Sequence, residues 1–210
     1  MTGGQVLGFA GVIVLGAMSP GPDFAVVVRR AAIAGRRGGM AAAAGVAAGI
    51  FGWAAAAAAG VAAMLSALPA VLEVVRYAGA GYLAYLGVRA LIAAIRRDAP
   101  ADPGADPGAA GGRSTWLSFR DGLLCNVLNP KAAVFFVALL PQFVPSGAGV
   151  GDVLVLSLVA VGVTLAWFFT VANLIAALRR FFARPVARRG LEAATGTALL
   201  GLGARLALTR

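Results

Sequence analysis

Two charged residues of opposite sign, Asp23 and Lys131, lie beside prolines inside long apolar stretches of this 210-residue chain. Asp23 ends the stretch Ser19-Pro20-Gly21-Pro22-Asp23, and Lys131 ends the stretch Asn129-Pro130-Lys131. A proline inside a helix removes one backbone hydrogen bond and clashes with the preceding turn. In lipid, non-helical backbone is tolerated only where it is buried in protein or lines a cavity. The two stretches therefore predict two broken helices, each with a charge at its break, that form one binding site.

The polar residues at the two breaks have more than one interpretation. Lys131 is the only lysine among 17 arginines, and a charge inside a membrane span is a functional hypothesis by default. Asp23 either pairs with Lys131 or caps the half-helix after Pro22, where the helix dipole stabilises a carboxylate. The amides of Asn126 and Asn129 flank the second break and offer donors and acceptors to a ligand. Asn129 alternatively satisfies only the local backbone.

Composition sets the class of protein around these residues. Hydrophobic residues make up 60% of the chain and charged residues 12%, with a mean hydropathy of +0.89. A typical soluble domain has about 25% charged residues, so we expect an integral membrane protein embedded in a lipid bilayer. The arginines are spaced between apolar runs, which argues against nucleic-acid binding. Histidine is absent and Cys125 is the single cysteine, which excludes disulfides, dithiol redox chemistry and the usual metal sites.

The apolar runs predict an all-α fold with six membrane-spanning helices. No positively charged region precedes the first run, so we expect it to stay as a spanning helix rather than a cleaved signal. The first and fourth spans contain the two breaks, near the middle of the membrane. The expected spans are the N-terminal region to about residue 28, a segment within 38–72, and residues 69–95, 116–144, 153–178 and 190–208.

The arginines indicate the orientation of these spans. Most of them, Arg29 and Arg30 included, fall in the loops after the first, third and fifth spans, where we expect them at the membrane interface. The positive-inside rule makes these loops cytoplasmic and places both termini outside. Glu192 lies one helical turn from Arg188 and Arg189, which predicts an ion pair at the end of the last helix.

The chain divides into two halves of three helices each, residues 1–95 and 115–210, which we expect to form one membrane domain. Residues 96–114 are rich in Ala, Pro and Asp and predict a flexible cytoplasmic linker. At an offset of 110 residues, Pro20 falls on Pro130. Because each half has an odd number of helices, the halves have opposite orientations. Such inverted repeats are typical of secondary transporters, which bind substrate between broken helices near the midplane.

Four stretches resemble the LysE/RhtB family of bacterial amino-acid exporters. They are Ser19-Pro20-Gly21-Pro22, Tyr82-Leu83-Ala84-Tyr85-Leu86-Gly87, Asn129-Pro130-Lys131-Ala132-Ala133 and Leu140-Pro141-Gln142-Phe143. The resemblance implies a multi-pass exporter in the bacterial inner (plasma) membrane that moves amino acids or close derivatives. It also implies that the proton-motive force drives export, and we expect Asp23 to accept the proton.

The remaining expectations concern partners and alternatives. No catalytic residue and no cofactor are expected. The glycines of the second span, Gly45, Gly49, Gly52 and Gly60, suit close helix packing in lipid, and glycine-rich faces also allow a homodimer. Two alternatives stay open. One is a membrane scaffold or assembly protein whose prolines only shape helices, and the other is a transporter of another small metabolite.

Overall fold

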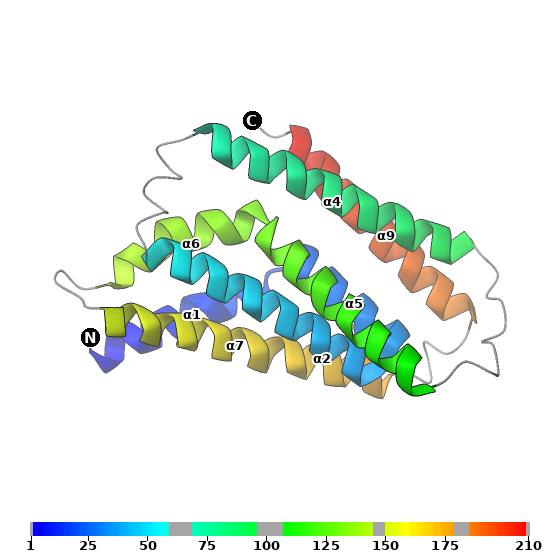
Figure 1. Ribbon diagram of the computed structural model, residues 1–210, viewed down its shortest axis with the longest axis horizontal. Helices are drawn as coiled ribbons and strands as arrows, with labels where there is room; N and C mark the ends of the chain where they lie inside the picture. The colour runs from blue at the N-terminus through cyan, green and yellow to red at the C-terminus, as the bar shows by residue number, and fades with distance from the viewer. Residues whose placement is uncertain (1, 59–68, 96–106, 145–149, 179–184, 209–210) are drawn as a thin grey trace.

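The computed structural model describes residues 2–58, 69–95, 107–144, 150–178 and 185–208. Within these ranges the chain forms a bundle of helices and no strand (Figure 1). The helices are α1 (Gly3–Met18), α2 (Pro22–Ala58), α4 (Pro69–Ile95), α5 (Pro107–Val127), α6 (Pro130–Phe143), α7 (Val150–Ala177) and α9 (Pro185–Leu208). Helices α4 and α9 pack side by side along one edge, α1 and α7 lie along the opposite edge, and α2 packs between α5 and α7.

The surface of the bundle and the apolarity of its helices fit a lipid environment. Three helical stretches of the described chain are long and apolar enough to cross a membrane: Pro22–Ala57, Arg76–Ile95 and Gly151–Ala177. Large apolar side chains point outward from the bundle, among them Leu7 and Leu158. An exposed apolar surface of this kind marks contact with a membrane or with other proteins.

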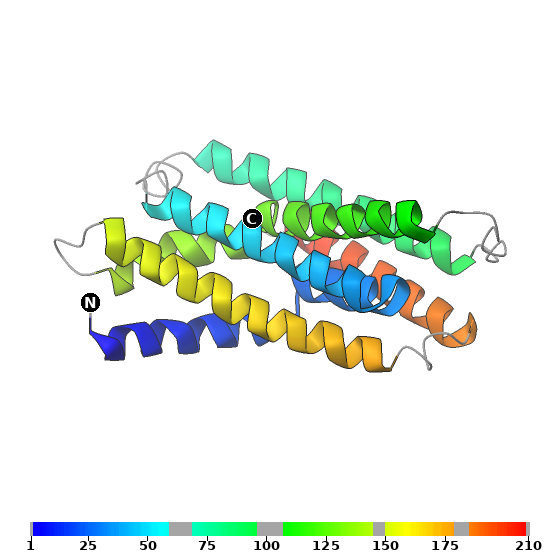
Figure 2. The ribbon, with the colours of Figure 1, turned by 60° about the horizontal axis from the view of Figure 1, so that its bottom comes forward.

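Helix α2 folds back on itself at Gly35. This glycine has φ 70° and ψ −167°, and it is the only residue with positive φ in the described chain. A Cβ atom on Gly39 would lie 2.6 Å from Cβ of Ala31, which shows that the two arms run antiparallel in close contact. Figure 2 shows the two arms side by side. The sequence predicted that the first span ends near Val28, but the helix continues to Gly35. The chain turns at this residue because glycine adopts positive φ without steric cost.

The two predicted helix breaks are present. Helix α1 ends at Met18 and is followed by extended backbone at Ser19, and Pro22 opens the next helix. Helix α5 ends at Val127, and α6 begins at Pro130. Proline is favoured at the first helical position because a backbone N–H at that position would have no partner within the helix, so its loss costs nothing. Both half-helices after the breaks therefore begin with proline followed by a charged residue.

The stretch predicted as a linker, residues 96–114, is partly helical. Its first part, residues 96–106, lies outside the described residues, and helix α5 begins at Pro107. The predicted end of the linker, residue 114, therefore lies seven residues after the start of α5 at Pro107. The sequence predicted a linker here from the composition of the whole stretch, whereas a proline in the first turn is compatible with a helix.

Glycines bring α5 unusually close to the second arm of α2. A Cβ atom on Gly45 would collide with the backbone carbonyl of Phe119, and one on Gly122 with the carbonyl of Ala42. Gly49 packs against the side chain of Asn126. The expectation of close packing is confirmed for Gly45 and Gly49. It is wrong for Gly52, where an added Cβ would meet no atom of another segment within 4 Å, and Gly60 lies outside the described residues.

Buried ion pairs join α2 to the second half of the chain. The Arg30 guanidinium bonds to Asp121 on α5, and Nε of Arg29 donates to Oε2 of Glu192 on α9 at 2.7 Å. All four residues are buried. The sequence predicted Arg29 and Arg30 at the membrane interface and Glu192 in a pair within its own helix. The prediction for Glu192 relied on distance along the chain, whereas the partner shown here is 163 residues away. The location of Arg29 and Arg30 at the membrane interface stays a prediction.

Candidate functional site

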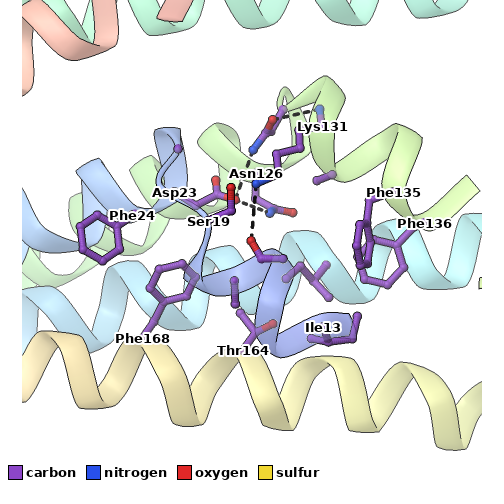
Figure 3. A pocket seen from close by; sticks show the side chains of 16 residues that line it. Ile13, Ser19, Asp23, Phe24, Asn126, Lys131, Phe135, Phe136, Thr164 and Phe168 are labelled. Atoms are coloured by element: carbon purple, nitrogen blue, oxygen red, sulfur yellow. Dashed lines mark hydrogen bonds between the residues drawn. The ribbon is translucent and has the colours of Figure 1, made fainter. Parts of the chain in front are cut away.

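The two helix breaks meet at one cavity. Helices α1, α2, α5, α6 and α7 all contribute to its lining (Figure 3). Its volume is about 70 Å³, in a measure in which one water molecule needs roughly 10–15 Å³. The cavity therefore has room for a cluster of waters or a small ligand. Five of the eight residues that the sequence predicted as binding residues line this cavity: Gly21, Asp23, Asn126, Asn129 and Lys131.

Asp23 is bound to amides of the other half of the chain. Nδ2 of Asn126 donates to Oδ2 of Asp23 at 3.0 Å, and Nδ2 of Asn129 donates to the same oxygen at 3.3 Å. The Cys125 thiol lies beside the carboxylate, and Oδ1 of Asp23 is buried without a partner in hydrogen-bond geometry. Because the carboxylate bonds to α5 and to the second break, the arrangement is more than a local helix cap.

Lys131 lies at the same cavity but does not pair with Asp23. No ion pair joins these two residues within 4 Å in the described chain; Nζ of Lys131 instead donates to the backbone oxygen of Gly16 at 3.5 Å. The backbone N–H of Lys131 donates to Oδ1 of Asn129 at 3.1 Å, so Asn129 caps α6. Asn129 thus satisfies local backbone, as one interpretation of the sequence expected, and its amide nitrogen also bonds to Asp23. Its contact with a ligand stays a prediction.

The backbone at the breaks supplies charge of both signs. The N-terminal ends of α2 and α6, at Pro22 and Pro130, carry the partial positive charge of a helix N-terminus. The C-terminal end of α1 presents carbonyl oxygens, among them that of Gly16. Gly21 lines the cavity, whereas the three prolines do not; Pro20 is exposed in the first break, and the other two open the half-helices. The direct role of the prolines in binding stays a prediction.

Aromatic side chains that the sequence did not single out as site residues form the rest of the wall. Phe24 and Phe168 line one part of the cavity, and Phe135 and Phe136 line another (Figure 3). Phe135 also touches the position of a Cβ on Gly16, at 3.3 Å. In a chain that is 60% hydrophobic, the sequence alone does not distinguish an aromatic residue that lines a cavity from one that packs against other helices.

The polar groups of the site are suited to reversible binding. In the ranges that the structure describes, no cluster of three or more His, Cys, Asp or Glu side chains can hold a metal ion. The site instead combines one carboxylate, one ammonium group, two amides, helix ends of both signs and an aromatic wall. Such a site can bind and release a small molecule that carries both charges.

Comparison with known proteins agrees with this chemistry. The family model described as LysE type translocator matches residues 14–210. The chain belongs to the LysE type translocator family. The resemblance noted in the sequence is thereby confirmed.

Curated relatives of this translocator span nearly its whole length. It is 30% identical to the threonine efflux protein of Escherichia coli (strain K12) over 206 residues, which cover 95% of each chain. It is 34% identical to an uncharacterized membrane protein of Pseudomonas aeruginosa over 208 residues, covering 96% of this chain and 92% of the relative. The leucine efflux protein of Klebsiella pneumoniae is 33% identical over 130 residues, covering 61% and 58%. No solved structure matches the chain.

Family membership and the apolar helices together fix the class of protein. The chain is a membrane protein that acts as a transporter of small molecules, and it is not an enzyme. The substrate of this transporter and the energy source that drives transport are proposed below from the geometry of the site.

Proposed function

We propose that this translocator exports amino acids from the bacterial cytoplasm and binds them as zwitterions in the cavity between the two breaks. One observation carries the proposal: Asp23, Lys131 and the N-terminal ends of two half-helices converge on the same cavity. Relatives of this chain are named threonine and leucine efflux proteins, which supports an amino acid as the substrate.

The two charged groups of an amino acid match the two kinds of polar group in the cavity. The substrate carboxylate binds at the N-termini of α2 and α6 and near the Lys131 ammonium, because helix N-termini and cations attract anions. The substrate ammonium binds at Asp23, whose Oδ1 has no partner in hydrogen-bond geometry, and at carbonyls freed by the breaks, such as that of Gly16. Hydrogen bonds to charged groups contribute about 1.5–3 kcal/mol each.

The membrane topology that we propose has six spans in two inverted halves, residues 1–95 and 115–210. The linker at 96–114, which includes the first two turns of α5, lies in the cytoplasm. The turn at Gly35 supports this topology, because it divides α2 between the first and second spans. The proposed spans are α1 with residues 22–34, residues 36–58, α4, α5 with α6, α7, and α9. We place the protein in the inner membrane with both termini outside, since the turn at Gly35 lies among four arginines.

Export is driven by proton antiport, and Asp23 is the proton acceptor. A carboxylate can bind either the substrate ammonium or a proton at the same oxygen. Competition between the two at Asp23 then links outward movement of the amino acid to inward movement of a proton. The buried position of Oδ1 and its lack of a fixed cation support this role.

The proposal is tested in everted membrane vesicles that contain the protein. The measurement is the uptake of labelled amino acids, beginning with threonine, when the vesicles are energised. We expect uptake that an uncoupler abolishes. Asp23→Asn and Lys131→Ala should each lower uptake about tenfold to a hundredfold, as expected for loss of one charge-assisted hydrogen bond. The control variants Glu73→Gln and Arg89→Gln change exposed charges on α4 and should keep normal uptake. Full uptake by both site variants, with normal amounts of protein in the membrane, contradicts the proposal.

A further inference from the structure

Thr164 on α7 is a buried polar residue of the cavity whose hydroxyl has no partner. It lines the cavity, the residue is 1% exposed, and Oγ1 makes no hydrogen bond to another protein group. Two other hydroxyl residues of the same helix behave differently. Oγ of Ser157 donates to the carbonyl of Val153 at 2.8 Å, and Oγ1 of Thr170 donates to the carbonyl of Ala166 at 2.7 Å.

The contrast within α7 shows that the Thr164 hydroxyl does not bond to the backbone carbonyl four residues earlier, as the other two hydroxyls do. Serine and threonine inside a helix usually point to solvent or bond back to the carbonyl four residues earlier. A buried hydroxyl without any partner costs free energy that an apolar side chain of the same shape would not cost. The hydroxyl of Thr164 bonds to no protein group, so it is available to a ligand in the cavity that supplies a partner.

The position of Thr164 separates it from the groups that would bind the charged ends of a substrate. Figure 3 shows Thr164 on α7 at one side of the cavity and Lys131 on α6 at the other, with Asn126 between them in this view. Phe168, one helical turn further along α7, and Phe24 make the neighbouring wall apolar. The side chain of a bound amino acid would extend toward this apolar part of the cavity, where the Thr164 hydroxyl can reach it by rotation about χ1, since threonine in a helix populates two χ1 positions.

We propose that Thr164 hydrogen-bonds the side chain of the substrate, so that the transporter favours small hydroxyl-bearing amino acids over aliphatic ones of the same shape. This inference rests on the proposed amino-acid export and adds the class of substrate to it. Threonine and valine are the natural pair for comparison, because they differ by one hydroxyl in place of a methyl group. One neutral hydrogen bond corresponds to a preference of about two- to tenfold for threonine.

Thr164→Val keeps the shape of the side chain and removes only its hydroxyl. Competitive uptake of labelled threonine and valine into everted vesicles gives the ratio of kcat/KM for the two substrates. We expect Thr164→Val to lower the threonine-to-valine ratio by about two- to tenfold and Thr164→Ser to keep it. Ser157→Ala and Thr170→Val are matched controls on the same helix, and they should leave the ratio unchanged because both hydroxyls bond to their own backbone.

A second measurement is independent of transport. Thermal unfolding of the purified, substrate-free protein in detergent should show a midpoint for Thr164→Val that is no lower than that of the unsubstituted chain, because the variant removes no hydrogen bond to the protein. A lower midpoint would mean that the hydroxyl has a structural partner, and this overturns the inference.

The transport outcomes separate the inference from the function on which it rests. If amino acids are exported and Thr164→Val changes threonine and valine equally, the side-chain role of Thr164 is wrong and the export function stands. If the unsubstituted chain exports no amino acid, the proposed function fails and the inference fails with it. A preference for valine over threonine in the unsubstituted chain also overturns the inference.

Discussion

The buried pair between Arg30 and Asp121 offers a quantitative test of how the two halves of the protein are held together. The Arg30 side chain is 10% exposed and the Asp121 side chain 1%. Asp121→Asn keeps the shape of the side chain but removes its charge, and Arg30 is then left buried without a counter-ion. Loss of one partner of a buried ion pair costs about 3–5 kcal/mol. We expect Asp121→Asn to lower the free energy of unfolding by this amount.

Arg120 supplies the matched control for this prediction. Its Nη2 lies 3.7 Å from Oδ1 of the same carboxylate, but its side chain is 40% exposed. Exposed ion pairs contribute about 0–1 kcal/mol, so Arg120→Gln should have a small effect. Asp121→Asn removes the carboxylate and with it both ion pairs, whereas Arg120→Gln removes only the exposed partner, so the difference between the two variants measures the buried pair with Arg30.

Unfolding by sodium dodecyl sulfate in mixed micelles, followed by circular dichroism, measures both costs. The double variant Arg30→Asp/Asp121→Arg reverses the two charges and should recover part of the lost stability, because each buried charge again has a partner. If Asp121→Asn costs less than about 1 kcal/mol, the same as Arg120→Gln, then the burial argument is wrong. Failure of the reversed pair to recover any stability would show that the geometry of the arginine and carboxylate at their present positions matters more than their charges.

Two glycine substitutions test the backbone geometry that forms the site. Gly45→Ala should destabilise the packing of α5 against α2, because the added Cβ collides with the carbonyl of Phe119, whereas Gly52→Ala has open space and should be neutral or slightly stabilising; detergent melting temperatures compare the two, and equal values would refute the predicted collision. Gly35→Ala should cost about 1–2 kcal/mol, because φ of 70° is strained for any residue with a Cβ, and an unchanged unfolding free energy in mixed micelles would contradict the sharp turn at this residue.

Local features of the fold were predictable from the sequence because they depend on short-range chemistry. The two breaks follow from prolines that have no N–H to donate, and they were predicted correctly at Pro22 and Pro130. The bounds of α4, Pro69–Ile95, were predicted from the same reasoning about proline and from the length of the apolar run. Composition alone also predicted a membrane protein, since 12% charged residues leave too little polar surface for water.

The partners of the polar residues were decided by the tertiary structure. Asp23 bonds to Asn126 and Asn129, which are 103 and 106 residues away, rather than to Lys131. Glu192 likewise bonds to Arg29, which is 163 residues away. The sequence predicted its partner among the arginines of its own helix. The sequence indicated which residues are polar within apolar spans, but not the rotation of each helix about its axis. That rotation depends on the packing of every helix against its neighbours.

Thr164 illustrates most clearly the difference between what the sequence determined and what the tertiary structure decided. From the sequence it is one of several polar residues of α7, similar to Ser157 and Thr170. Only the packed bundle turns Thr164 toward the cavity and leaves its hydroxyl without a partner, while the other two bond to their own helix. Local composition therefore determined that this protein has broken helices in a membrane. The long-range packing of those helices decided which side chains form the cavity, because burial and hydrogen bonding between distant segments exist only once the chain is folded.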